Sequence, residues 1–190
     1  MEIGTHRRLN LGCGQNRLPE PWENFDAQPA DGVMHVDLNR RLPFEKGSAR
    51  FVLLEHVIEH LTFRAAMALL VDVKHTLGPG GVLRLCFPDA TRASVCLPAY
   101  ERFLQQRGLL VGTGQPHVLR QVLLGWNHAS AWTWQLARAA LEALGYVNVT
   151  RTTYGVSQRP DLHGVDGHHL TCDVAVAEME TTCLEAECPS

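Results

Sequence analysis

Lysine is scarce in this sequence of 190 residues, which contains only Lys46 and Lys74. Lysine and arginine together number 17, the arginines are scattered along the chain, and the formal net charge is −3. A nucleic-acid-binding surface needs basic residues that cluster on one face. We therefore expect no nucleic acid among the partners of this protein.

The pattern C-x-x-C is absent, although the chain has six cysteines. This absence argues against a zinc ribbon and against a thioredoxin-type site. Cys13, Cys86 and Cys172 lie within apolar runs, where cysteine behaves as a small hydrophobic residue. The cysteines therefore indicate a reduced protein rather than a disulfide framework.

Long apolar runs are missing as well, and none approaches the length that spans a bilayer. Residues 1–10 are polar and contain no apolar core of a signal peptide. These two absences predict a cytoplasmic protein with no membrane partner.

Short apolar runs alternate with segments of helical periodicity, which predicts an α/β fold with a mostly parallel sheet. Helices are expected over residues 62–77, over 98–125 in two pieces, and over 130–144. We expect one domain over residues 1–180 and a flexible tail over 181–190, where apolar residues are few. The expected strands are residues 8–11, 22–26, 33–37, 51–54, 82–87, 147–153 and 171–177.

The segment Asn10-Leu11-Gly12-Cys13-Gly14 directly follows the first expected strand. Glycines allow a sharp turn and a close approach of the backbone to a ligand, and ligands of open α/β sheets bind beyond the carboxyl ends of strands. Asp26 ends the next strand, where a carboxylate can accept hydrogen bonds from ribose hydroxyls. Asp37, which Leu38 follows, can meet an adenine edge. Both acids can equally well stabilise a turn or cap a helix.

Taken together, these segments resemble the class I S-adenosylmethionine-dependent methyltransferases. The resemblance is strongest to a group of small predicted methyltransferases that open with L-N-L-G-C-G, and it runs in order from about residue 9 to 149. The matching segments are L-N-L-G-C-G at 9–14, W-E-N-F-D at 22–26, E-H-V-I-E-H-L at 55–61, L-G-P-G-G at 77–81, and N-H with L-E-A-L-G-Y at 127–128 and 141–146.

The resemblance implies a Rossmann-like, doubly wound sheet of seven strands in the order 3-2-1-4-5-7-6, with the last strand antiparallel. It implies S-adenosylmethionine as the cofactor, with Glu55 and His56 near its methionine end and near the methyl acceptor. The cofactor-binding residues that we expect are Asn10, Gly12, Cys13, Gly14, Asp26, Asp37, Leu38 and Glu55.

The chain departs from the family pattern at several positions. Pro19 and Pro21 prevent a full helix between the first two strands, and Glu55 stands where a small residue is common. Arg17 occupies the third glycine position of a dinucleotide fingerprint, which argues against NAD. The Asn-Pro-Pro-Tyr motif of amino-methylating enzymes is absent after the fourth strand, which lowers the odds of a DNA-base or glutamine methyltransferase.

The chain has ten histidines, and an oxygen acceptor needs a base, for which histidine is well suited at neutral pH. The candidates are His56, His128 and His168, and with Glu55 the first two form the expected catalytic set. His56 and His60 have a spacing that can bind metal or supply a base, but a structural role is favoured there. His163, His168 and His169 share a loop with Asp161 and Asp166, yet that loop lacks the spacing of a structural zinc site, so we expect no metal.

The function expected from these residues is methyl transfer to a small-molecule or sugar-type acceptor. The alternative is a non-catalytic protein that binds S-adenosylmethionine or acts as a scaffold. Its lost chemistry would be signalled by Glu55 and by Ala49-Arg50, which replaces the Phe-Asp that is frequent in the family before the fourth strand. So small a domain covers its acceptor face thinly, which is consistent with a homodimer.

Overall fold

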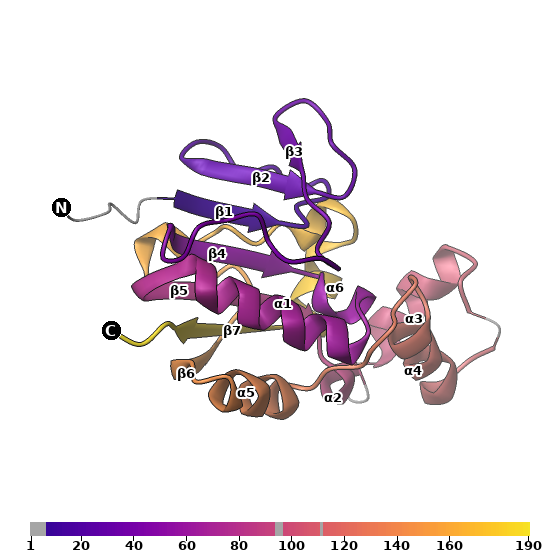
Figure 1. Cartoon of the computed structure of the whole chain (residues 1–190). Coiled ribbons are helices and arrows are strands. Elements are labelled where there is room, and N and C mark those ends of the chain that lie inside the picture. The colour runs from indigo at the N-terminus through magenta and orange to yellow at the C-terminus, as the bar shows by residue number, and fades with distance from the viewer. Residues whose placement is uncertain (1–6, 94–96, 111) are drawn as a thin grey trace.

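A computed structural model describes residues 7–93, 97–110 and 112–190 of the chain. Its sheet has seven strands in the order β3-β2-β1-β4-β5-β7-β6 (Figure 1). All neighbours from β3 to β5 pair in parallel, and β7 is antiparallel to both β5 and β6. The strands are β1 (Arg7–Leu11), β2 (Trp22–Asp26), β3 (Val33–His35), β4 (Ala49–Glu55), β5 (Leu77–Pro88), β6 (Val147–Thr152) and β7 (Thr181–Glu187).

The helices α1 (Phe63–Thr76) and α5 (Trp134–Ala143) cover one face of the sheet (Figure 1). Each begins at a threonine, Thr62 or Thr133, whose side chain accepts a hydrogen bond from the backbone N–H three residues later. Alternate residues of the strands, such as Leu83 of β5, pack beneath these helices in the largest apolar core.

The opposite face is covered by the connection between β6 and β7, and the β1–β2 connection contains no helix. The β6–β7 connection contains the short helices η2 (Pro160–Leu162), η3 (His168–Leu170) and α6 (Val174–Glu180). Leu162 and Val165 pack there against Trp22, Phe51 and Leu53 of the sheet.

Arg84 of β5 anchors this covering segment from within the sheet, where its side chain is fully buried. Its Nε donates to Asp166 Oδ1 at 2.7 Å, and its Nη2 makes a second bond to the same carboxylate. Its Nη1 donates to Glu185 Oε1 of β7 at 2.8 Å. The connection is therefore fixed at a point next to Gly167 and His168.

The remaining helices gather where the parallel strands end (Figure 1). Helix η1 (Ile58–His60) follows β4, and α2 (Ala90–Ala93) follows β5. Helices α3 (Leu97–Gln106) and α4 (Gln115–Leu124) pack on each other through the apolar residues Tyr100, Phe103, Leu104, Val118 and Val122. Among the described residues, no helix combines the length and apolar character that crossing a membrane requires.

The strand order expected from the resemblance is confirmed, but its seventh strand was placed on the wrong residues. Residues 171–177 form no strand, because Val176 and Glu180 face the interior one helical turn apart in α6. The expectation of a flexible tail over 181–190 is also wrong, since β7 is a buried strand between β5 and β6. The segment has few apolar residues, but the carboxylate of its Glu185 is buried against Arg84.

Candidate active site

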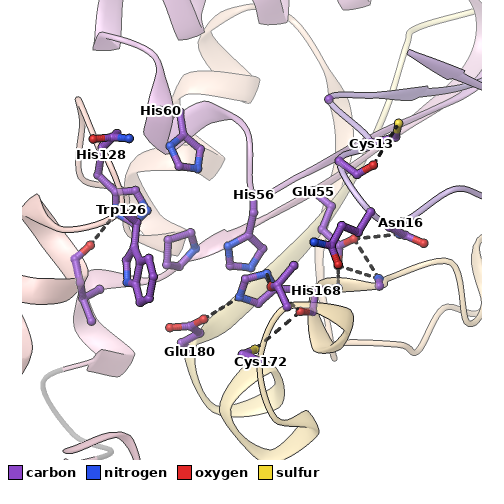
Figure 2. Close-up of a pocket in the computed structure, with 18 of the residues that line it drawn as sticks. Cys13, Asn16, Glu55, His56, His60, Trp126, His128, His168, Cys172 and Glu180 are labelled. Carbon is purple, nitrogen blue, oxygen red and sulfur yellow. Dashed lines mark hydrogen bonds and ion pairs between the residues drawn. The ribbon is translucent and has the colours of Figure 1, made fainter. Parts of the chain in front are cut away.

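A cavity of about 430 Å³ lies where β1 and β4 end, beneath α3, α4 and η3. The order of the sheet reverses between these two strands, which is the position where open α/β sheets bind ligands. Several residues singled out from the sequence line it: Gly12, Cys13, Gly14, Glu55, His56, His60, His128 and His168. The structure thus brings together residues that follow β1, residues at the end of β4 and residues that follow α4 (Figure 2).

The glycine loop after β1 is tied to the end of β2. The backbone N–H groups of Gly12 and Cys13 both donate to the carbonyl of Phe25, at 2.8 and 3.0 Å. Gly12 has a φ of 73°, and a Cβ built there would lie 2.6 Å from Val57 Cγ2. Gly14 has a φ of 51° but no atom within 4 Å of such a Cβ. Gly12 is therefore required for packing, whereas Gly14 leaves open space beside the backbone.

Asp26 lies at the rim of this loop, outside the cavity lining. Its carboxylate accepts hydrogen bonds from the backbone N–H groups of Gly14, at 2.9 Å, and Gln28, at 3.0 Å. The same carboxylate that can hold a ribose therefore also shapes the glycine loop.

Three other residues expected at the cofactor also lie outside the cavity lining. Asn10 is buried, and its amide donates to Asn16 O at 2.7 Å and to Asn24 Oδ1 at 2.9 Å. Asp37 stabilises a turn by accepting from Asn39 N at 3.0 Å, and Leu38 packs against the core. In this structure Asn10 and Asp37 therefore have structural partners.

Glu55, at the end of β4, is engaged by the chain itself (Figure 2). Its carboxylate accepts from the backbone N–H of Gly167 at 2.8 Å, from that of His168 at 3.0 Å, and from Asn16 Nδ2 at 3.0 Å. Burial raises the pKa of Glu55, and the hydrogen bond from Gly167 opposes that rise. Glu55 therefore fastens η3 to the edge of the cavity.

His56 follows Glu55 with a φ of 51°, a left-handed conformation that is uncommon outside glycine. Its Nε2 lies 2.9 Å from Thr181 Oγ1, and its ring stacks on that of His168 with centroids 3.5 Å apart. Burial lowers the pKa of His56 well below its usual range. The imidazole is therefore neutral at physiological pH, as a general base must be.

His168 has the opposite character, because its Nε2 lies 2.8 Å from Glu180 Oε1. Burial lowers the pKa of His168, but its interactions with Cys172 and Glu180 outweigh burial and raise that pKa to about 10. Protonated His168 therefore forms an ion pair with Glu180 and is unsuited to act as a base at neutral pH.

The other members of the histidine-rich loop lie apart from the cavity. Asp161 pairs with Arg8 at 2.6 Å, Asp166 pairs with buried Arg84, and His163 contacts Ser157. His169 bonds to the Tyr154 hydroxyl at 3.0 Å. Of the residues that the sequence grouped in this loop, His168 alone lines the cavity.

Several cavity residues were missed from the sequence. Asn16, Trp126 and Glu180 line the cavity, as do Tyr100 and Phe103 of α3. Glu180, Tyr100 and Phe103 lie in segments without a recognisable motif, so no motif pointed to them, whereas Trp126 directly precedes the N-H segment at 127–128. Asn16 follows the glycine loop by two residues, which was a signal that it lies near the cavity.

Comparisons with known proteins identify the fold. No protein-family model and no curated protein matches the chain. A SAM-dependent methyltransferase from Archaeoglobus fulgidus is 15% identical, with a TM-score of 0.60 over 97% of this chain and 87% of that one. An S-adenosylmethionine-dependent methyltransferase from Mesorhizobium loti is 14% identical, with a TM-score of 0.56 over 98% and 93% of the two chains.

The chain has the fold of the class I S-adenosylmethionine-dependent methyltransferases. Some larger proteins share the fold, among them phosphoethanolamine N-methyltransferase 2 from Haemonchus contortus, solved in complex with S-adenosyl-L-methionine. That protein is 11% identical, with a TM-score of 0.54, and the match covers 97% of this chain but about half (49%) of the larger one.

Proposed function

We propose that this protein transfers the methyl group of S-adenosylmethionine to a small-molecule or sugar-type acceptor. The observation that carries the proposal is the cavity at the β1–β4 switch point, which is bordered by a glycine loop in a methyltransferase fold. S-adenosylmethionine, when bound, supplies an electrophilic methyl group on a sulfonium.

The residues around the glycine loop fit such a cofactor. Open space beside Gly14 lets a ligand approach the backbone, and the Asp26 carboxylate at the rim has lone pairs beyond its two backbone partners. In this proposal Asp26 accepts hydrogen bonds from the ribose, while Gly12, Cys13 and Gly14 border the cofactor. Asn10, Asp37, Leu38 and Glu55 support this site by shaping the segments around it.

Methyl transfer requires an acceptor lone pair held in line with the sulfonium. We assign His56 the role of general base for an oxygen acceptor, because it lines the cavity and is neutral at physiological pH. His128 also lines the cavity, whereas protonated His168 positions His56 by stacking on its ring.

Calorimetric titration with S-adenosylmethionine and S-adenosylhomocysteine tests the cofactor assignment. Asp26→Ala should weaken binding by roughly 1.5–3 kcal/mol, since it removes charged hydrogen bonds to the ribose. Asp26→Asn keeps one oxygen that can hold the glycine loop and should lose less. Asp161→Ala removes a carboxylate that is paired with Arg8 away from the cavity and should leave affinity unchanged.

The titration also separates the two candidate functions. Wild-type protein that binds neither compound refutes the proposal and leaves a scaffold with this fold. Binding without methyl transfer to any of a broad panel of hydroxyl acceptors would favour the non-catalytic alternative.

A further inference from the structure

Glu59, His60 and His128 converge beside the cavity, and their candidate ligand atoms all lie within 4.8 Å of one another. Glu59 and His60 belong to η1, whereas His128 follows α4. Figure 2 shows His60 and His128 side by side. The rings of His60 and His128 are 5.0 Å apart at an angle of 78°, so their nitrogens approach from different planes. Two imidazoles and one carboxylate are a ligand set typical of catalytic zinc sites.

The two segments are clamped together by their backbones. The N–H groups of Ala129 and Ser130 donate to the carbonyl of Glu59 at 2.8 and 3.0 Å. The hydroxyl of Ser130 also donates to Leu61 O at 2.8 Å. The three side chains are therefore held together by contacts that need no bound ligand.

Glu59 is 1% exposed, and neither carboxylate oxygen has a hydrogen-bond partner among the residues that the structure describes. His56 Nδ1 lies 3.1 Å from Oε1, close enough for an ion pair only if that imidazole is protonated. A buried carboxylate without hydrogen bonds is costly. A bound cation would supply the partner that this carboxylate lacks.

His128 is oriented as a ligand, because its Nδ1 lies 2.6 Å from the carbonyl of Val122. The carbonyl can only accept, so Nδ1 carries the proton and Nε2 carries the free lone pair. A histidine that donates its other ring N–H to a backbone carbonyl is the usual arrangement around a metal.

The backbone beside these ligands is strained. Trp126 and Asn127, which directly precede His128, have φ values of 57° and 62°, and His56 before η1 has 51°. Left-handed conformations are uncommon for residues other than glycine and cluster at functional sites. Here they lie on both segments that carry the three ligands.

Two other groups with metal-binding side chains are less suitable. In the group of His56, His168 and Glu180, the two rings are stacked 10° from parallel, so their lone pairs do not converge, and His168 is ion-paired with Glu180. In the group of Cys86, Asp166 and Cys183, the Asp166 carboxylate is already paired with Arg84.

We propose that Glu59, His60 and His128 bind a divalent transition-metal ion such as Zn²⁺ or Co²⁺, with its open coordination positions facing the cavity. This replaces the expectation from the sequence that the protein binds no metal. An oxygen of the methyl acceptor would fill an open position, a role that rests on the proposed function and leaves His56 as the base. Metal binding itself does not depend on that function.

The test is calorimetric titration of metal-free protein with Zn²⁺, together with the visible absorption spectrum after addition of Co²⁺. We expect one ion per chain, and a loss of at least about 100-fold in affinity for Glu59→Gln and for His128→Asn, since even indirect partners of metal ligands are worth 10–100-fold. His75→Asn is the matched control, because His75 is an exposed histidine on α1, and it should bind like wild type.

Absence of wild-type binding would overturn the proposal, as would wild-type affinity in both ligand variants with native circular dichroism. Loss of binding in Glu180→Gln or Cys183→Ser, with Glu59→Gln unaffected, would overturn it too, because the ion would then occupy another group. Titration with S-adenosylhomocysteine separates the two proposals: metal binding without cofactor binding refutes methyl transfer alone, and the reverse result refutes the metal site alone.

Discussion

Arg84 offers a direct test of how the covering segment between β6 and β7 is held. Its buried guanidinium is shared by Asp166, whose side chain is fully buried, and Glu185, whose side chain is 6% exposed. Arg84→Met keeps much of the side-chain volume and removes the charge. Breaking a buried ion network by deleting one partner costs about 3–5 kcal/mol, because uncompensated charges remain in the interior. That is a large share of the roughly 5–15 kcal/mol that stabilises a typical domain.

The measurement is the free energy of unfolding from urea titration followed by circular dichroism. Arg138→Met is the control, since Arg138 and Glu142 form a half-exposed pair on α5 that should contribute about 0.3–0.5 kcal/mol. Adding Asp166→Asn and Glu185→Gln to Arg84→Met should recover part of the loss, because the buried charges are then removed together.

Hydrogen exchange links this network to the cavity. The amides of Gly167 and His168 donate to Glu55, and Gly167 directly follows Asp166. These amides should exchange faster in Arg84→Met than in Arg138→Met. A loss below about 1 kcal/mol with unchanged protection would refute the role of Arg84 as the anchor.

Three further changes probe the fold and the cavity. Gly12→Ala should destabilise the protein by about 1–3 kcal/mol in urea unfolding, because the added Cβ would meet Val57 and the residue has a left-handed φ. Gly14→Ala should cost only about 1 kcal/mol, because its Cβ would meet no atom. Equal losses would contradict this packing argument. Leu184→Ala should cost about 2–5 kcal/mol, because Leu184 is buried in β7, and a loss near zero would restore the flexible tail. The pKa of His168 is raised from 6.5 to about 10, so its ion pair with Glu180 should stabilise the fold fully below pH 6.5 and lose this effect as the pH rises toward about 10. His168→Gln should remove this pH dependence of the free energy of unfolding. An unchanged pH dependence would contradict the ion pair.

Much of the fold was predictable, because local patterns carry it. Residues 22–26 were predicted as a strand and form β2, and residues 62–77 were predicted as a helix and contain α1. The strand order followed from the resemblance. The last strand was missed because residues 181–190 contain few apolar residues. Its burial depends in part on Glu185, which pairs with Arg84, 101 positions earlier.

The candidate site was predicted in part. The glycine loop, Glu55, His56 and His128 follow strands or motifs, and the structure places them around one cavity. The contribution of Glu180 was missed, because it ends a helix that looked like a strand. Asp37 was given a ligand role, although its turn partner Asn39 was an alternative visible from the sequence.

The sequence by itself determined the alternation of strands and helices, the glycine loop and the prolines that remove the first crossover helix, because backbone preferences and apolar periodicity act over a few residues. Only the tertiary structure decided that residues 153–180 cover the sheet face opposite α1 and α5, that Glu55 binds the backbone of Gly167 in this segment, and that His128 lies beside Glu59. These outcomes depend on buried charges and hydrogen bonds that join residues far apart in the chain. Each such group must find a partner as water is excluded, and the folded chain alone specifies which partner that is.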